Sequence, residues 1–123
     1  MLALRGAVNA ADSKGEVPLH CAARSSTDLV LLLLGHGADS RAADSEGWTP
    51  IHEASHWSDA RAVQALLQQG ANVRCASKEG ETPLHVVPGG YGDAAICDVL
   101  IAAQADIHAM DNEGHTPLLQ IFI

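Results

Sequence analysis

The chain has 123 residues, a formal net charge of −8 and only four aromatic side chains. This length suits a single domain whose modest core is built from small aliphatic side chains. The negative charge argues against nucleic acid and anionic membrane surfaces as partners, and leaves basic partners or none.

No apolar segment approaches the roughly 20 residues that a membrane-spanning helix needs. The most apolar segment, LVLLLL at residues 29–34, is interpreted as the buried stripe of a helix. The three cysteines, Cys21, Cys75 and Cys97, are an odd number without the spacing of a disulfide framework. This pattern favours a reducing compartment. We therefore expect an intracellular protein of the cytoplasm, with the nucleus left open.

Four related segments follow one another along the chain. They begin with DSKGEVPLH at Asp12, DSEGWTPIH at Asp44, SKEGETPLH at Ser77 and DNEGHTPLL at Asp111. A sequence period of 32 to 34 residues indicates a repeat architecture. We place repeats at about residues 12–43, 44–76 and 77–110, with partial repeats at 1–11 and 111–123.

The residue pattern of each repeat predicts a turn followed by two short helices. In the second repeat Gly47 suits a positive φ in a tight turn, Thr49 suits a helix N-cap and Pro50 suits the first helical position. A later apolar triple at i, i+3 and i+4 predicts the second helix, which Gly70 ends; it consists of Val63, Leu66 and Leu67. Val17 replaces the threonine in the first repeat, which predicts a cap weaker by about 1 kcal/mol.

The third repeat and the chain ends depart from this pattern. Pro88 falls inside the last turn of the expected first helix, so this helix should end early into a longer loop that carries Tyr91. Residues 118–123 are mostly apolar and leave no room for a second helix. Because a terminal repeat cannot bury its apolar face alone, we expect further repeats, another chain or an irregular cap at the ends.

These segments resemble ankyrin repeats. The family motif T-P-L-H stands here as VPLH, TPIH, TPLH and TPLL, and GAD or GAN follows in the expected phase. The resemblance covers essentially the whole chain. It implies an all-α ankyrin-repeat solenoid of stacked helix–turn–helix units with β-hairpin fingers. It also implies a scaffold or adaptor that binds another protein along a concave face of fingers and first helices.

One short segment suggests a different chemistry. HEASH at residues 52–56 matches the H-E-x-x-H motif of zinc peptidases, in which two histidines bind the metal and the glutamate activates water. However, Asp59 and Ala62 stand where the extended motif has glycine and histidine, and no third ligand is evident. The resemblance instead implies that His52, like His20 and His85, hydrogen-bonds the backbone between repeats. We therefore expect no catalytic residue, metal or cofactor, and a zinc hydrolase remains the least supported alternative.

A protein partner is expected at the fingers and the first helices. Both tryptophans fall there among acidic residues, and tryptophan is enriched at binding hot spots. Such an anchor would suit an aromatic or aliphatic side chain beside a lysine or arginine. The candidate contact residues are Trp48, Trp57, Glu46, Glu53, His56, Glu79, Glu81 and Tyr91. The alternative is a structural spacer in a longer array, in which the tryptophans only cover contacts between repeats.

Overall fold

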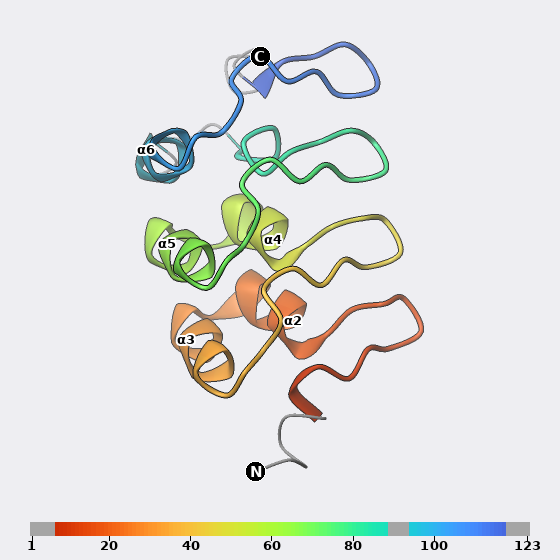
Figure 1. Ribbon diagram of the computed structural model, residues 1–123, viewed down its shortest axis with the longest axis vertical. Coiled ribbons are helices and arrows are strands. Elements are labelled where there is room, and N and C mark those ends of the chain that lie inside the picture. The colour runs from red at the N-terminus through yellow and green to blue at the C-terminus, as the bar shows by residue number, and fades with distance from the viewer. Residues whose placement is uncertain (1–6, 89–93, 118–123) are drawn as a thin grey trace.

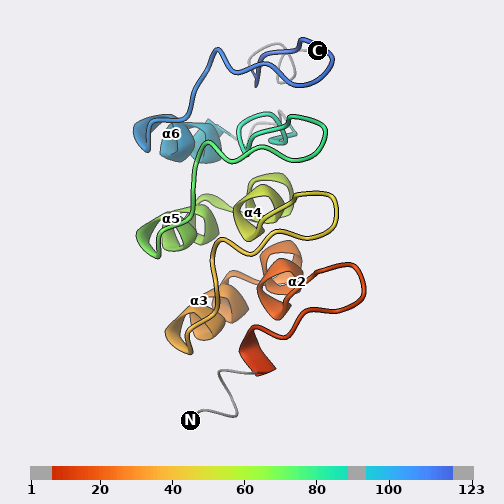
Figure 2. The same cartoon turned by 45° about the vertical axis from the view of Figure 1, so that its right-hand side comes forward.

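The computed structural model describes residues 7–88 and 94–117. These residues contain five helices, in chain order α2 (Pro18–Ser25), α3 (Thr27–Gly35), α4 (Pro50–Trp57), α5 (Ala60–Gln68) and α6 (Ala94–Ala102). The helices stack in two columns, with α2 and α4 in one and α3, α5 and α6 in the other (Figure 1). The loops before α2 and α4 project to one side of the stack, and Figure 2 shows the same arrangement from a second direction. The predicted all-α solenoid is confirmed.

The second helices begin at side-chain caps. The Ser26 hydroxyl accepts the Leu29 N–H at 3.2 Å before α3, and an Asp59 carboxylate oxygen accepts the Ala62 N–H at 3.0 Å before α5. Such caps satisfy backbone donors that have no partner within the helix. The first helices begin differently, since Thr49 makes no side-chain cap to the backbone. Thr49 does occupy the predicted N-cap position, but its hydroxyl lies 3.0 Å from His52 Nδ1, and its N–H donates to the same ring nitrogen.

The core lies between the two columns of helices. α2 packs against α4, α3 against α5, and α5 against α6. Ala22 and Ala54 are fully buried, and their small side chains let α2 and α4 approach closely. In the segment 29–34 only Val30 is fully buried, whereas Leu29, Leu31 and Leu32 are exposed. The interpretation of this whole segment as a buried stripe is therefore wrong.

The third repeat has no regular first helix in its described residues. Residues 83–86 form a single turn, in which the His85 N–H donates to the Thr82 carbonyl and the Val86 N–H donates to the Pro83 carbonyl. Pro88, which lacks a backbone N–H, follows directly, so the predicted early end is confirmed. The expected loop with Tyr91 and the apolar segment 118–123 lie outside the described residues.

The fingers are tight turns, and the described ranges contain no regular strand. Neighbouring fingers are joined by backbone hydrogen bonds, because Ser45 N–H donates to the Lys14 carbonyl at 2.8 Å and Lys78 N–H donates to the Glu46 carbonyl at 2.9 Å. Gly47 at the second turn has a φ of 79°. Within the part of the chain that the structure describes, no helix has the length and apolarity to cross a membrane.

Candidate protein-interaction surface

Equivalent side chains of successive fingers form a row along the stack. Each finger closes with a backbone hydrogen bond of 2.9 Å from its first residue to the residue four positions later, as from Asp44 N–H to the Trp48 carbonyl. The equivalent acceptors in the four fingers are Glu16, Trp48, Glu81 and His115. Because the fingers are stacked in register, Trp48 lies between two glutamates of the row. We call this row, together with the adjoining face of α2 and α4, the finger–helix face.

The motif histidines link each repeat to the next finger. His52 Nε2 lies 2.8 Å from the Glu81 carbonyl, and a carbonyl only accepts, so Nε2 carries the proton. His52 Nδ1 is therefore an acceptor, and it takes the Thr49 N–H at 3.2 Å. His20 bonds the Trp48 carbonyl and His85 bonds the His115 carbonyl in the same way. Each ring thus binds the backbone at the start of its own helix, or of the single turn in the third repeat, and joins the following repeat.

The HEASH segment is already engaged within the fold. Both ring nitrogens of His52 are hydrogen-bonded, so neither offers a lone pair to a metal ion. The Glu53 carboxylate is bonded to Arg24 at 2.7 Å, and His56 Nδ1 donates to the Val86 carbonyl at 2.7 Å. A zinc peptidase needs the first of these histidines as a metal ligand. The geometry therefore disfavours the zinc alternative on the residues that define its motif.

Glu53 was expected at an exposed contact position, but only 4% of its surface is exposed. Arg24 NH1 lies 2.6 Å from Glu16 and 2.7 Å from Glu53, so one guanidinium bridges two repeats. Burial raises the pKa of Glu53, although the nearby Arg24 charge opposes this. The oxygens of Glu16, Glu53 and Asp44 lie within 4.8 Å of one another. Arg24 pairs with two of these three carboxylates, Glu16 and Glu53.

The two tryptophans lie on either side of His56. The Trp48 and His56 rings meet edge to face with their centroids 6.1 Å apart, and the His56 and Trp57 centroids are 4.4 Å apart. Trp57 is 59% exposed, whereas Trp48 is partly buried against His52 at 5.4 Å. Three of the candidate contact residues are thus brought into one aromatic cluster.

A cavity of about 270 Å³ opens beside Trp48. Its walls come from the second and third fingers, from α4 and from residues 85–88 of the third repeat; they are Trp48, His56, Glu81, His85, Val86, Val87 and Pro88. The first three of these residues are among the contact residues predicted from the sequence, and the last four are not. An alignment of the repeats could have indicated this cavity. It places Val86 at the position of Glu53 in the preceding repeat, and His56 at the position of Arg24.

The other acidic candidates lie further out. Glu46 and Glu79 are exposed in the second and third fingers, where their backbone carbonyls accept hydrogen bonds from the next finger. Glu81 is half-buried at the cavity wall. Tyr91 lies outside the described residues. Contact of these residues with a partner stays a prediction.

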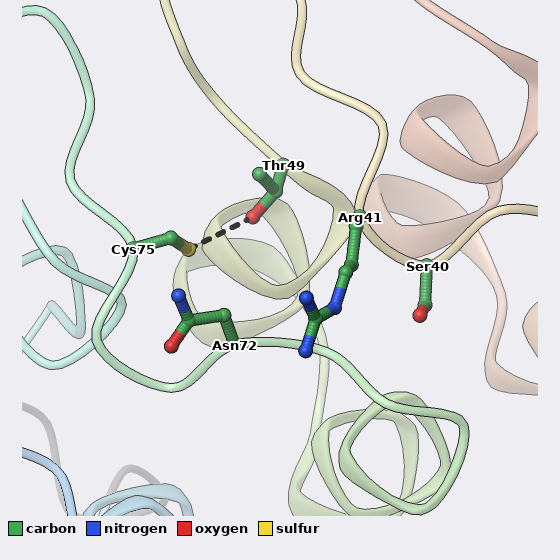
Figure 3. Close-up of a pocket in the computed structure, with 5 residues that line it drawn as sticks. All are labelled: Ser40, Arg41, Thr49, Asn72 and Cys75. Carbon is green, nitrogen blue, oxygen red and sulfur yellow. Dashed lines mark hydrogen bonds between the residues drawn. The ribbon is translucent and has the colours of Figure 1, made fainter.

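A second, smaller cavity of about 140 Å³ is lined by Ser40, Arg41, Thr49, Asn72 and Cys75 and is shown in Figure 3. The Cys75 thiol points into it and lies 3.4 Å from the Thr49 hydroxyl and 3.8 Å from His52 Nδ1. Burial raises the pKa of Cys75, so the thiol stays protonated and is a poor nucleophile. The three cysteines form no disulfide.

Stacked helix pairs with projecting turns define this chain as a helical repeat protein. A family model described as "Ankyrin repeats (3 copies)" matches residues 1–76, and one described as "Ankyrin repeat" matches residues 79–112. The chain therefore belongs to the ankyrin-repeat family. Ankyrin repeats are protein-interaction modules, and the family is generally not enzymatic.

Curated relatives share these repeats as small parts of much longer proteins. Human neurogenic locus notch homolog protein 2 is 34% identical over 109 residues, which is 87% of this chain and 4% of that protein. Mouse protein phosphatase 1 regulatory subunit 12A is 40% identical over 53 residues, or 42% of this chain and 5% of the relative. Human SMC5-SMC6 complex localization factor protein 1 is 40% identical over 55 residues, or 43% of this chain and 5% of the relative.

Proposed function

We propose that this chain holds a partner protein on the finger–helix face, with Trp48 as the central anchor. The observation that carries the proposal is the cavity beside the half-buried Trp48, which Glu81 also lines. Binding hot spots are typically tryptophans in largely desolvated pockets. The cavity is smaller than the roughly 300–1,000 Å³ of a small-molecule site. It therefore suits a side chain of a partner better than a free metabolite.

The exposed Trp57 extends the anchor along α4. It adds apolar surface next to His56, and Glu81 lines the adjoining cavity. A partner segment with an apolar or aromatic residue next to a basic one matches both features. We propose the cytoplasm or nucleus as the place of binding, because the chain has an odd number of cysteines without the spacing of a disulfide framework.

The test is capture of partners from a cell lysate on the immobilised chain. The wild type is compared with a Trp48→Ala/Trp57→Ala double variant whose thermal unfolding curve is unchanged. Leu32→Ala, which removes a 56% exposed apolar side chain on α3, is the matched control. We expect the double variant to lose partners that the wild type and the control both retain. Equal capture by all three proteins would contradict the proposed face, and no capture by any would favour a structural spacer.

A further inference from the structure

The first junction, between repeats 12–43 and 44–76, shows how this fold binds a guanidinium group. Arg24 of α2 reaches across the finger–helix face to Glu16 of its own finger and to Glu53 of the next repeat, at 2.6 and 2.7 Å. Its side chain thereby fills the space between the two repeats. A planar guanidinium with five fixed donors is suited to holding two carboxylates at once.

The second junction, between repeats 44–76 and 77–110, has shorter side chains at the equivalent positions. His56 stands in place of Arg24, and Val86 stands in place of Glu53. His56 turns its Nδ1 to the Val86 carbonyl and makes no ion pair within the described chain. Because both replacements remove side-chain length, the second junction keeps the open cavity of about 270 Å³.

The cavity combines an aromatic wall with negative charge. Trp48 and Glu81 both line it. Glu81 has no ion-pair partner among the described residues. Val87 and Pro88 add an apolar floor. Lys78 on the third finger is the nearest basic residue in the sequence, but its side chain does not line the cavity. A cation is attracted to a tryptophan face and to a carboxylate alike.

We propose that the cavity of the second junction receives an arginine side chain of the partner protein. The guanidinium stacks on Trp48 and donates hydrogen bonds to the Glu81 carboxylate, and the aliphatic stem packs on Val87 and Pro88. Arginine is favoured over lysine because only its planar group stacks on an aromatic ring and forms paired bonds to one carboxylate. The inference rests on the proposed function and names the partner's chemistry at that site.

The direct test uses a defined probe rather than an unknown partner. The full chain, labelled with ¹⁵N, is titrated with the blocked tripeptide acetyl-Gly-Arg-Gly-amide and followed by two-dimensional NMR. We expect shifts of the Trp48 indole N–H and of the Val86 and Val87 amides. The matched probe with citrulline, which is neutral and nearly isosteric, is expected to bind about fivefold more weakly, the upper limit for a partly exposed ion pair. The lysine tripeptide should also bind more weakly.

Two variants test whether Glu81 is the carboxylate that binds the arginine probe. Glu81→Gln should weaken the arginine tripeptide about fivefold, because it removes the charge and keeps the shape of the side chain. This variant should fold, since the Glu81 group that His52 binds is the backbone carbonyl. Glu79→Gln on the same finger is the control and should bind normally, because Glu79 is exposed and does not line the cavity.

Equal binding of the arginine and citrulline probes, or no shift at the cavity, would overturn the arginine inference. Equal or tighter binding of the lysine probe would overturn the preference for a guanidinium. The proposed function is separable from these results. If the tryptophan double variant lost partners that Glu81→Gln retained, the proposed protein-interaction function would stand and the proposal of a partner arginine would be contradicted.

Discussion

At the scale of single residues, Glu53 shows how strongly the next repeat sets the role of a side chain. Its carboxylate is 5% exposed, and Arg24, whose side chain is 34% exposed, bonds it from the preceding repeat. A buried charge without a partner is costly, so the pair is needed once Glu53 is buried. Burial also raises the pKa of Glu53, which makes its neutral form easier to reach in the folded protein.

We predict that Arg24→Gln lowers the free energy of unfolding by about 1–3 kcal/mol, somewhat less than for a fully buried pair because Arg24 is partly exposed. The measurement is urea unfolding at about neutral pH. The loss should shrink as the pH falls toward about 5, since protonated Glu53 needs no cation and a raised pKa favours protonation in the folded state. Glu16→Gln should cost less, because Arg24 then still neutralises Glu53. An equal decrease in the free energy of unfolding for Arg24→Gln and Glu16→Gln would contradict the view that Arg24 stabilises the fold mainly by pairing with Glu53.

At the scale of elements, the turns of the fingers set the spacing between repeats. A Cβ atom on Gly47 would lie 3.0 Å from the Lys78 backbone nitrogen and 3.1 Å from the Ser77 Cα. Lys78 N–H is the donor that joins the third finger to the Glu46 carbonyl. Gly47 is thus required both for its positive φ and for the close approach of the next finger. Gly70, with a φ of 96°, has no atom within 4 Å of such a Cβ.

We predict that Gly47→Ala lowers the free energy of unfolding by about 2 kcal/mol or more, and Gly70→Ala by about 1 kcal/mol. Both substitutions strain a positive φ, but only the first also pushes against the backbone of the next repeat. Chemical unfolding of the two variants side by side measures the difference. If Gly70→Ala proved as damaging as Gly47→Ala, the close approach of the fingers would not be the cause.

At the scale of the whole molecule, the described helices pack against those of the neighbouring repeats. Stability in such stacks is approximately the sum of repeat and junction contributions. The histidine links run through every junction in the described residues, from His20 to Trp48, from His52 to Glu81 and from His85 to His115. Burial, the largest influence, lowers the pKa of His52 below its ordinary value of 6.5. The imidazole is therefore neutral in the folded protein.

We predict that the free energy of unfolding falls as the pH drops below 6.5, the ordinary pKa of histidine. In that range the unfolded chain binds a proton at His52 before the folded protein does, so acid favours unfolding. One such group contributes at most about 1.4 kcal/mol per pH unit. Urea unfolding between about pH 7.5 and pH 5.5 measures the slope. His52→Gln should be less stable at neutral pH but should show a shallower slope; an unchanged slope would contradict the role of His52.

Much of the fold could be predicted from the sequence because its signals are local and recur. The turn glycines, the prolines at the starts of α2 and α4 and the apolar spacing of the second helices each act within a few residues. Pro88 likewise acts locally, because it directly follows the single turn that stands in place of a first helix in the third repeat. The prediction that the LVLLLL segment is buried was wrong, because apolar side chains on a helix are buried only where another element covers them.

The sequence by itself determined the repeat period, the helix pairs, the family and the region in which a partner is expected. Only the tertiary structure decided that Glu53 is internal and that Trp48 and Glu81 share one cavity. Residues about 30 positions apart meet only when repeats stack in register, and no local pattern states which side chain a neighbour will meet. These contacts between repeats decide whether a carboxylate is paired within the fold or open to a partner. At the first junction Arg24 pairs with Glu53, whereas at the second junction the shorter His56 leaves a cavity open.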